Sequence, residues 1–219
     1  MAAEGRQQTQ TASAAAPQQQ AQQAQPQQQQ QALAPLMTSL STRHELQFSW
    51  TLYYDNPPRD ADWNNFKQYL TSVITFRTVE DFWGAINNIR PPSGLPTGAN
   101  YSLFKGDVLP VWEDSANNKG GKWLINVNRK TARLDEMWLN TMLGLIGENF
   151  EVQDEITGAV CSLRPKGDRV ALWTRTTDES VRVMGEKFKA AVQPDEPLNF
   201  MSHSDAGGSF KVKSKYIIN

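Results

Sequence analysis

The sequence predicts an α+β domain with a largely antiparallel β-sheet and helices on one face. Two observations predict this class: short segments of alternating apolar and polar residues follow one another along the chain, and helical periodicity separates only some of them. Residues 7–31 are mostly Gln, Ala and Pro, a composition that cannot bury enough apolar surface to fold. We therefore expect a disordered Gln-rich tail at 1–43 and a single domain at 44–219.

A strand opens the domain at 46–54, where apolar and polar side chains alternate as in a half-buried strand. The polar segment 55–62, which contains two prolines, is expected to be a loop, and it delivers Trp63 near its end. A large indole after such a loop has no obvious core to enter. We therefore expect Trp63 to contact a ligand or a partner.

Three helices are predicted. The first begins at Thr78, whose hydroxyl can cap it, and runs to about Ile89, before two prolines. The second covers 134–147 and is apolar on several faces, as a buried helix would be. The third is amphipathic over 181–192. The remaining strands are expected at 101–105, 108–113, 122–128, 158–164, 169–175, 198–203 and 210–218.

Composition excludes several classes of protein. No apolar run reaches the roughly 18 residues of a membrane span, so we expect no membrane contact. The single cysteine, Cys161, excludes an intramolecular disulfide and a cysteine zinc site, and it favours a reducing, intracellular setting. A net charge of −1 does not suit bulk electrostatic binding of long nucleic acids. Seven tryptophans are more than a core of this size would easily bury with every indole N–H satisfied.

The hairpin predicted at 158–175 concentrates positive charge. A four-residue loop would place Arg164 opposite Arg169, with Lys166 in the loop between them. Alternation along the strand places Trp173 on the same face as Arg169. Like charges facing each other are unfavourable unless an anion lies between them. The pattern therefore fits either a solvated hairpin end or a di- or triphosphate site with an aromatic residue at its inner end.

Six segments carry a wider resemblance: HELQFSWTLYY, TVEDFW, YSLFKGDVLPVWED, NKGGKWLI, LIGENF and GAVCSLRPKGDRVALW. With these segments in this order, the chain resembles the eukaryotic translation initiation factor 4E family of mRNA 5′-cap-binding proteins. The resemblance runs from about His44 to the C-terminus. It implies a curved, largely antiparallel sheet with about three helices on its convex face and a slot for the cap on the concave side.

The resemblance also implies how the cap is held. Trp63 and Trp112 match the two tryptophans that stack on 7-methylguanine. Tyr69 is a fallback for Trp63, because the segment from Trp63 to Phe76 is longer than in the family. Glu113 matches the carboxylate that accepts hydrogen bonds from guanine N1–H and N2–H. The other matches are the phosphate-binding cations Arg164, Lys166 and Arg169, the outer cation Lys122, and Trp173, which contacts the N7-methyl group.

A second implied site is a surface that docks a partner helix of the Tyr-x4-Leu-hydrophobic type, carried by a scaffold initiation factor or a repressor. Helical periodicity alone would bury the residues of this surface in the core. Glu45 stands where the family has Pro, and Asn140 stands where it has Glu, so the choice of partner stays open. The implied residues are Val79, Trp83, Leu139 and Leu143, flanked by His44, Leu46 and Gly147.

The expected function is therefore binding of the mRNA cap by a cytoplasmic monomer, which also enters the nucleus in some settings, to recruit the translation machinery. We expect no cofactor, no metal and no covalent chemistry. The alternatives are a cap-binding paralogue that represses translation, a cap-processing enzyme and a generic single-stranded RNA-binding module. The enzyme is disfavoured because the cluster holds no nucleophile, and His44 and His203 lie elsewhere in the chain. The generic module would need an extended basic groove.

Overall fold

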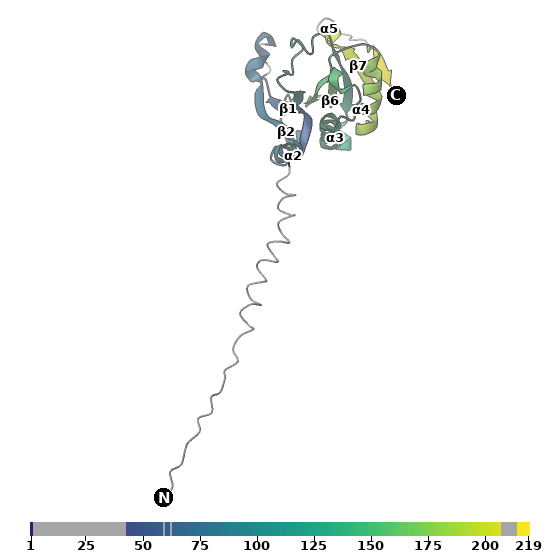
Figure 1. Ribbon diagram of the computed structural model, residues 1–219. Helices are drawn as coiled ribbons and strands as arrows, with labels where there is room; N and C mark the ends of the chain where they lie inside the picture. The colour runs from purple at the N-terminus through teal and green to yellow at the C-terminus, as the bar shows by residue number, and fades with distance from the viewer. Residues whose placement is uncertain (2–42, 59, 62, 207–213) are drawn as a thin grey trace. The chain divides into compact units, whose positions relative to one another are not determined.

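The computed structural model describes residues 1, 43–58, 60–61, 63–206 and 214–219, and the side chains of 63–65 and 205–206 lie outside this description. A compact unit runs from His44 to Asn219 (Figure 1). The predicted Gln-rich tail, apart from its two end residues, lies outside the described residues. Within the described part of the chain, no helix is long and apolar enough to cross a membrane.

The described strands form one eight-stranded sheet in the order β2-β1-β3-β5-β6-β4-β7-β8, and every neighbouring pair is antiparallel. This arrangement confirms the predicted fold class. The strands are β1 (Glu45–Asp55), β2 (Thr71–Thr78), β3 (Asn100–Lys105), β4 (Gly121–Val127), β5 (Ile156–Ser162), β6 (Asp168–Thr174), β7 (Leu198–Ser202) and β8 (Tyr216–Ile218).

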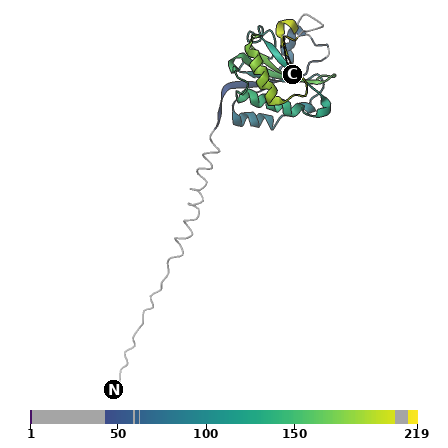
Figure 2. The same ribbon diagram turned by 90° about the vertical axis from the view of Figure 1, so that its right-hand side faces the viewer.

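Three α-helices of two or more turns accompany the sheet in the described part of the chain, and all three were predicted. The Thr78 hydroxyl caps the first of them by accepting a hydrogen bond from Asp81 N at 3.2 Å. The views of Figures 1 and 2 place α2 and α3 along the same side of the sheet, and α4 packs on α3. The helices are α2 (Val79–Ile86), α3 (Leu134–Ile146), α4 (Ser180–Val192) and the short α5 (His203–Ala206), with 3-10 turns η1 (Trp63–Tyr69), η2 (Pro92–Gly94), η3 (Arg129–Thr131) and η4 (Gln153–Glu155).

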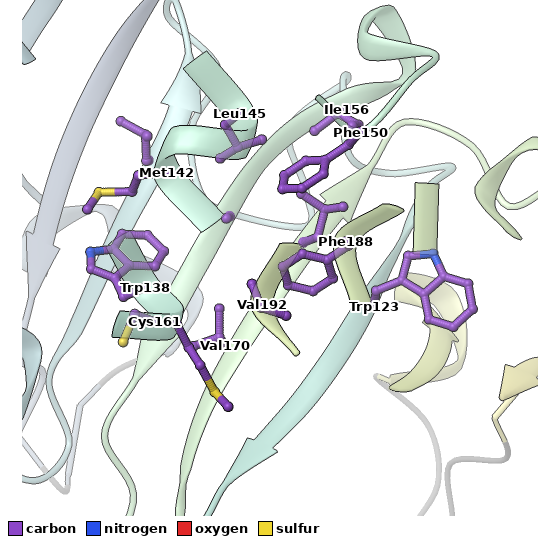
Figure 3. Packing of buried hydrophobic residues seen from close by; sticks show 14 of the residues in the cluster. Trp123, Trp138, Met142, Leu145, Phe150, Ile156, Cys161, Val170, Phe188 and Val192 are labelled. Atoms are coloured by element: carbon purple, nitrogen blue, oxygen red, sulfur yellow. The ribbon is translucent and has the colours of Figure 1, made fainter. Parts of the chain in front are cut away.

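The main core lies between the helices and one face of the sheet (Figure 3). Trp50, Trp123 and Trp138 are fully buried in this core. The indole N–H of Trp123 donates to Val181 O at 2.7 Å, whereas that of Trp138 finds no acceptor among the described atoms. One buried indole N–H of this core therefore lacks an acceptor among the described atoms. This agrees with the expectation that the core could not bury all seven tryptophans.

The strand predicted at 108–113 is wrong. This segment belongs to an irregular stretch at 106–120, in which side chains rather than a neighbouring strand satisfy the backbone. The Asp114 carboxylate accepts from the N–H groups of Leu109 at 3.0 Å and Ala116 at 2.9 Å. The Asn117 amide donates to the carbonyls of Leu109 and Val111, both at 2.9 Å. Pro110, which has no N–H, could not have completed a strand ladder.

Two further differences concern β2 and the last predicted strand. β2 was missed, because three of its residues, 71–73, are exposed and its alternation is weak, as expected for an edge strand. The strand predicted at 210–218 is described only as Tyr216–Ile218, since 207–213 lie outside the described residues.

Candidate functional site

A cavity of about 570 Å³ lies against the face of the sheet that turns away from the main core. Successive side chains of a strand point to opposite faces of the sheet, so each strand serves both the core and the cavity. In β6, Val170 and Leu172 enter the core, whereas Arg169, Ala171 and Trp173 line the cavity. The volume lies within the range of about 300–1,000 Å³ that is typical of small-ligand sites. The other strand residues of the lining are Asp55, Asn100, Ser102, Lys122, Leu124, Val160, Ser162 and Met201.

The hairpin at the polar end of the cavity has a register different from the predicted one. Arg169 pairs with Ser162, so Arg164 does not lie opposite Arg169 across the strands. Leu163 leaves the hairpin to pair with Ala99 instead, through Leu163 N–H to Ala99 O at 3.0 Å. The Asp168 carboxylate then accepts from Arg164 N at 3.1 Å and tightens the turn. Arg164 and Arg169 nevertheless both line the cavity, as predicted.

Backbone and amide oxygens, not a carboxylate, hold the Arg164 guanidinium in place. Its Nη1 donates to Leu163 O at 2.9 Å and to Gly98 O at 3.2 Å, and its Nη2 donates to Asn100 Oδ1 at 2.8 Å. The nearby carboxylate of Asp168 is instead paired with Arg129, at 2.8 Å. The Arg164 charge is therefore oriented but not neutralised by a direct partner.

The cations of the cavity are left without carboxylate partners. Among the described residues, Arg164, Arg169 and Lys122 form no ion pair. Burial, reinforced by the charges of Arg169 and Arg164, lowers the pKa of Lys122. Burial likewise lowers the pKa of Arg164. An anion placed among these three side chains would relieve their mutual repulsion, so the cavity is suited to polyphosphate.

Trp173 lines the cavity beside Lys122, its partner in the β4–β6 register, and its ring packs against His203, which is not part of the lining. Trp173 is 8% exposed, and its ring centroid lies 4.2 Å from that of His203 and 5.4 Å from that of Phe104. Neither the Trp173 indole N–H nor His203 Nε2 has a hydrogen-bond partner among the described atoms. Burial, and then the charge of Lys122, lowers the pKa of His203 to about 4, so this ring is neutral at physiological pH.

The expectation that His203 lies away from the cluster is therefore wrong. β7 pairs with β4, and its last residue, Ser202, directly precedes His203, so the end of this strand delivers the ring to Trp173. The strand predicted at 198–203 was the signal in the sequence that could have placed His203 at the end of a sheet strand.

Several predicted residues do not line the cavity in the described structure. Trp112 is 55% exposed and Glu113 is exposed, both on the stretch 106–120 that contributes Pro110 to the lining. Lys166 is exposed in the hairpin turn. The Trp63 side chain lies outside the described residues, and the fallback Tyr69 is half-buried and does not line the cavity.

Most of the cavity lining was not predicted from the sequence, and three of these residues bear on its chemistry. Phe66 reaches it from η1, which shows that the segment carrying Trp63 borders the cavity. Asp55 and Asn100 are buried at its polar end and are joined by a hydrogen bond of 2.5 Å from Asn100 Nδ2 to Asp55 Oδ1. The position of Asp55 at the end of a strand, beside a ligand loop, was an available signal.

The residues implied for partner docking lie on α2 and α3. Trp83 is 38% exposed and packs edge-on against the fully buried Phe82, with ring centroids 5.1 Å apart. The alternative that places Trp83 wholly in the core is thus wrong. We call the half-buried Val79, Leu139 and Leu143, together with Trp83, the docking surface.

The three implied flanking residues differ in exposure. Gly147 is exposed after the end of α3, whereas Leu46 is buried in the main core and can only support the surface from beneath. His44 is exposed, and its Nδ1 lies 2.6 Å from Glu80 Oε1, which ties the start of β1 to the first turn of α2.

Comparison with known proteins supplies the family. The family model described as eukaryotic initiation factor 4E matches residues 45–216. The chain belongs to the eukaryotic initiation factor 4E family. Among curated members, the eukaryotic translation initiation factor 4E of Aplysia californica is 42% identical over 185 residues, covering 80% of this chain and 85% of that protein. That of Saccharomyces cerevisiae is also 42% identical, over 170 residues, covering 76% of this chain and 79% of that protein.

Solved structures of initiation factor 4E proteins share the fold. The Ascaris suum eIF4E-3 in complex with an m2,2,7G cap aligns with a TM-score of 0.74 at 41% identity, covering 81% of this chain and 99% of that chain. The Caenorhabditis elegans eIF4E-3 in complex with the 4E-binding protein Mextli and a cap analog aligns with a TM-score of 0.74 at 38% identity, covering 81% and 100%. The initiation factor 4E fold of this chain therefore includes its cavity-bearing sheet and its helices.

Proposed function

We propose that this chain binds the 7-methylguanosine 5′ cap of mRNA in the cavity and acts in translation initiation. The observation that carries the proposal is the cavity itself, which is lined by the buried Trp173 and by three cations, Arg164, Arg169 and Lys122, that form no ion pair among the described residues. Two solved structures of Ascaris suum eIF4E-3, which share this fold, are complexes with an m2,2,7G cap and an m7G cap.

The methylated base is held by stacking. Methylation at N7 makes guanine cationic, so indole faces above and below it contribute a cation–π energy of about 0.5–2 kcal/mol. Base stacking on an aromatic adds about 1–3 kcal/mol. We assign these faces to Trp63 and Trp112. An indole as exposed as Trp112 is free to close over an entering base, since rotamer changes on binding are common.

A carboxylate completes recognition of guanine. Glu113 adjoins Trp112 and is exposed, and we propose that it accepts hydrogen bonds from N1–H and N2–H. Bonds to a charged acceptor contribute about 1.5–3 kcal/mol. Trp173, which lines the cavity, then contacts the N7-methyl group. Unmethylated guanine keeps the donors but loses the positive charge, so the site reads methylation.

We propose that Arg164, Arg169 and the exposed Lys166 bind the phosphates, with Lys122 as the outer cation. Affinity is expected to rise from 7-methyl-GMP through the diphosphate to 7-methyl-GTP and to fall with added salt. Arg164→Glu should flatten the phosphate series by at least about tenfold, because it reverses the best-oriented charge, and should leave methyl discrimination in place. Fluorescence titrations with the three nucleotides measure both.

Lys130→Glu is the matched control, because Lys130 is an exposed cation of the neighbouring turn η3 and does not line the cavity. It should change the phosphate series little. If Arg164→Glu still prefers the triphosphate as strongly as the parent chain, the anion site lies elsewhere.

We further propose that the docking surface binds a helix of the Tyr-x4-Leu-hydrophobic type, through which the chain joins an initiation scaffold. Solved relatives are complexes with 4E-binding proteins, from C. elegans and from a schistosome. The exposed indole of Trp83 amid half-buried aliphatic side chains is the kind of surface that accepts an amphipathic helix. We place this activity in the cytoplasm, with the nucleus as a second compartment, and assign the chain no covalent chemistry.

A further inference from the structure

The polar end of the cavity contains a buried acid among its cations. Asp55 is 2% exposed, lines the cavity and accepts a hydrogen bond from Asn100 Nδ2 at 2.5 Å. Asn100 Oδ1 in turn accepts from Arg164 Nη2 at 2.8 Å. A continuous chain of hydrogen bonds therefore joins a buried carboxyl group to the guanidinium assigned above to the phosphates.

This chain fixes the orientation of the Asn100 amide. An ionised carboxylate only accepts hydrogen bonds and a guanidinium only donates them. Asn100 satisfies both neighbours solely when its NH₂ faces Asp55 and its oxygen faces Arg164. Replacing the acceptor at position 55 would free the amide to rotate and would remove one of the oxygens that orient Arg164.

The charge of Asp55 opposes the proposed ligand. A buried negative charge that lines a polyphosphate site repels the phosphates, and among the described residues no cation forms an ion pair with it. Burial already raises the pKa of Asp55 to about 6, against the lowering effects of Asn100 and Arg164. Phosphates brought into the same cavity act as further negative charges and raise this pKa again.

We propose that Asp55 is a positioning residue that orients Arg164 through Asn100 and takes up a proton when the cap phosphates enter the cavity. This inference rests on the proposed function. The direction of the pH dependence of affinity follows from linkage. A group whose pKa is higher in the complex than in the free chain gains a proton on binding, so affinity rises as pH falls through the interval between these two pKa values. That interval begins near 6 and extends upward.

Other charged groups around the site are unchanged in Asp55→Asn, so the ratio of its affinity to that of the parent chain isolates the titration of Asp55. The described charged groups that share the cavity are Arg164 from the hairpin, Arg169 from β6 and Lys122 from β4. His203, beside β4, has its pKa lowered to about 4 and stays neutral from pH 5.5 to 8. Asp168 is held by Arg129.

The test measures affinity for 7-methyl-GpppG between pH 5.5 and 8 by tryptophan fluorescence. This ligand has no terminal phosphate monoester, the group that titrates near pH 6. Asp55→Asn keeps an acceptor for Asn100 but removes the charge, and should bind more tightly than the parent chain at pH 8. The ratio of the two dissociation constants should approach one at pH 5.5, a change of about tenfold if the phosphates raise the pKa by one unit.

Asp55→Ala removes the acceptor as well as the charge, so it should bind more weakly than Asp55→Asn at both pH values. A constant ratio between the parent chain and Asp55→Asn across the pH range would overturn the proton uptake. Equal affinities of the Asn and Ala variants would overturn the positioning role. Melting temperatures of the variants check that each one folds.

Calorimetry on the unaltered chain gives an independent readout should a variant fail to fold. At pH 6.5, in two buffers of different ionisation enthalpy, 7-methyl-GpppG should bind with a larger net proton uptake than the nucleoside 7-methylguanosine. Equal uptake overturns the inference.

Unmethylated GpppG separates the proposed cap recognition from the proposed role of Asp55. If it binds as tightly as the methylated ligand but with the predicted pH profile, methyl recognition fails while the role of Asp55 stands. Failure to bind either ligand overturns both.

Discussion

Replacing Trp83 by Ala is expected to abolish binding of a Tyr-x4-Leu-hydrophobic peptide while leaving cap binding intact. An aromatic anchor at the centre of a helix-docking site typically contributes about 2 kcal/mol or more, which is a loss of roughly thirtyfold or more in affinity. Because Trp83 is 38% exposed and its contact with Phe82 is edge-on, the loss of stability should be no more than about 1 kcal/mol. Peptide affinity, 7-methyl-GTP affinity and thermal melting measure the three effects.

Phe82→Ala is the matched control for this prediction. Phe82 is the next residue on the same helix but is completely buried, so its removal should destabilise the domain by about 3–5 kcal/mol and reduce both binding activities together. If Trp83→Ala behaves as Phe82→Ala should, Trp83 acts as a core residue and the docking surface is wrongly placed.

Trp112→Ala is expected to weaken 7-methyl-GTP binding by at least one stacking contribution, about 1–3 kcal/mol, and to reduce the preference for the methylated base. Stability should change little, because the side chain is 55% exposed and no buried contact is lost. Titrations with 7-methyl-GTP and GTP, followed by fluorescence, measure both affinities.

Asn118→Ala serves as the control, since Asn118 is exposed on the same irregular stretch and its backbone N–H, which bonds to Asp114 O at 2.9 Å, is retained. Its affinity should match that of the parent chain. An unchanged affinity of Trp112→Ala would mean that this exposed indole does not close over the base.

The elements that were predicted correctly are those whose cause is local. The cap at Thr78, the alternation of β1 and the amphipathic pattern of α4 each depend on residues close together in sequence. The predicted strand at 108–113 failed because Asp114 and Asn117 satisfy its backbone from outside the segment, which alternation alone does not reveal.

Only the part of the candidate site that depends on local alternation was predicted. Alternation along β6 correctly placed Arg169 and Trp173 on one face. It could not reveal that Leu163 pairs with Ala99 and shifts the hairpin register, nor that strand pairing brings Asp55 to the cavity and His203 against Trp173. These are contacts between segments distant in the chain, and sheet order, which no local pattern encodes, determines them.

The most direct test of the account compares 7-methyl-GTP with GTP as ligands of the unaltered chain, at one pH and one salt concentration, through quenching of tryptophan fluorescence. The two nucleotides differ in the N7-methyl group and the positive charge that it creates. We expect 7-methyl-GTP to quench the fluorescence and to bind more tightly than GTP by at least the cation–π contribution of about 0.5–2 kcal/mol. Equal affinities for the two nucleotides, or no quenching by 7-methyl-GTP, would contradict the proposal that this chain recognises the mRNA cap.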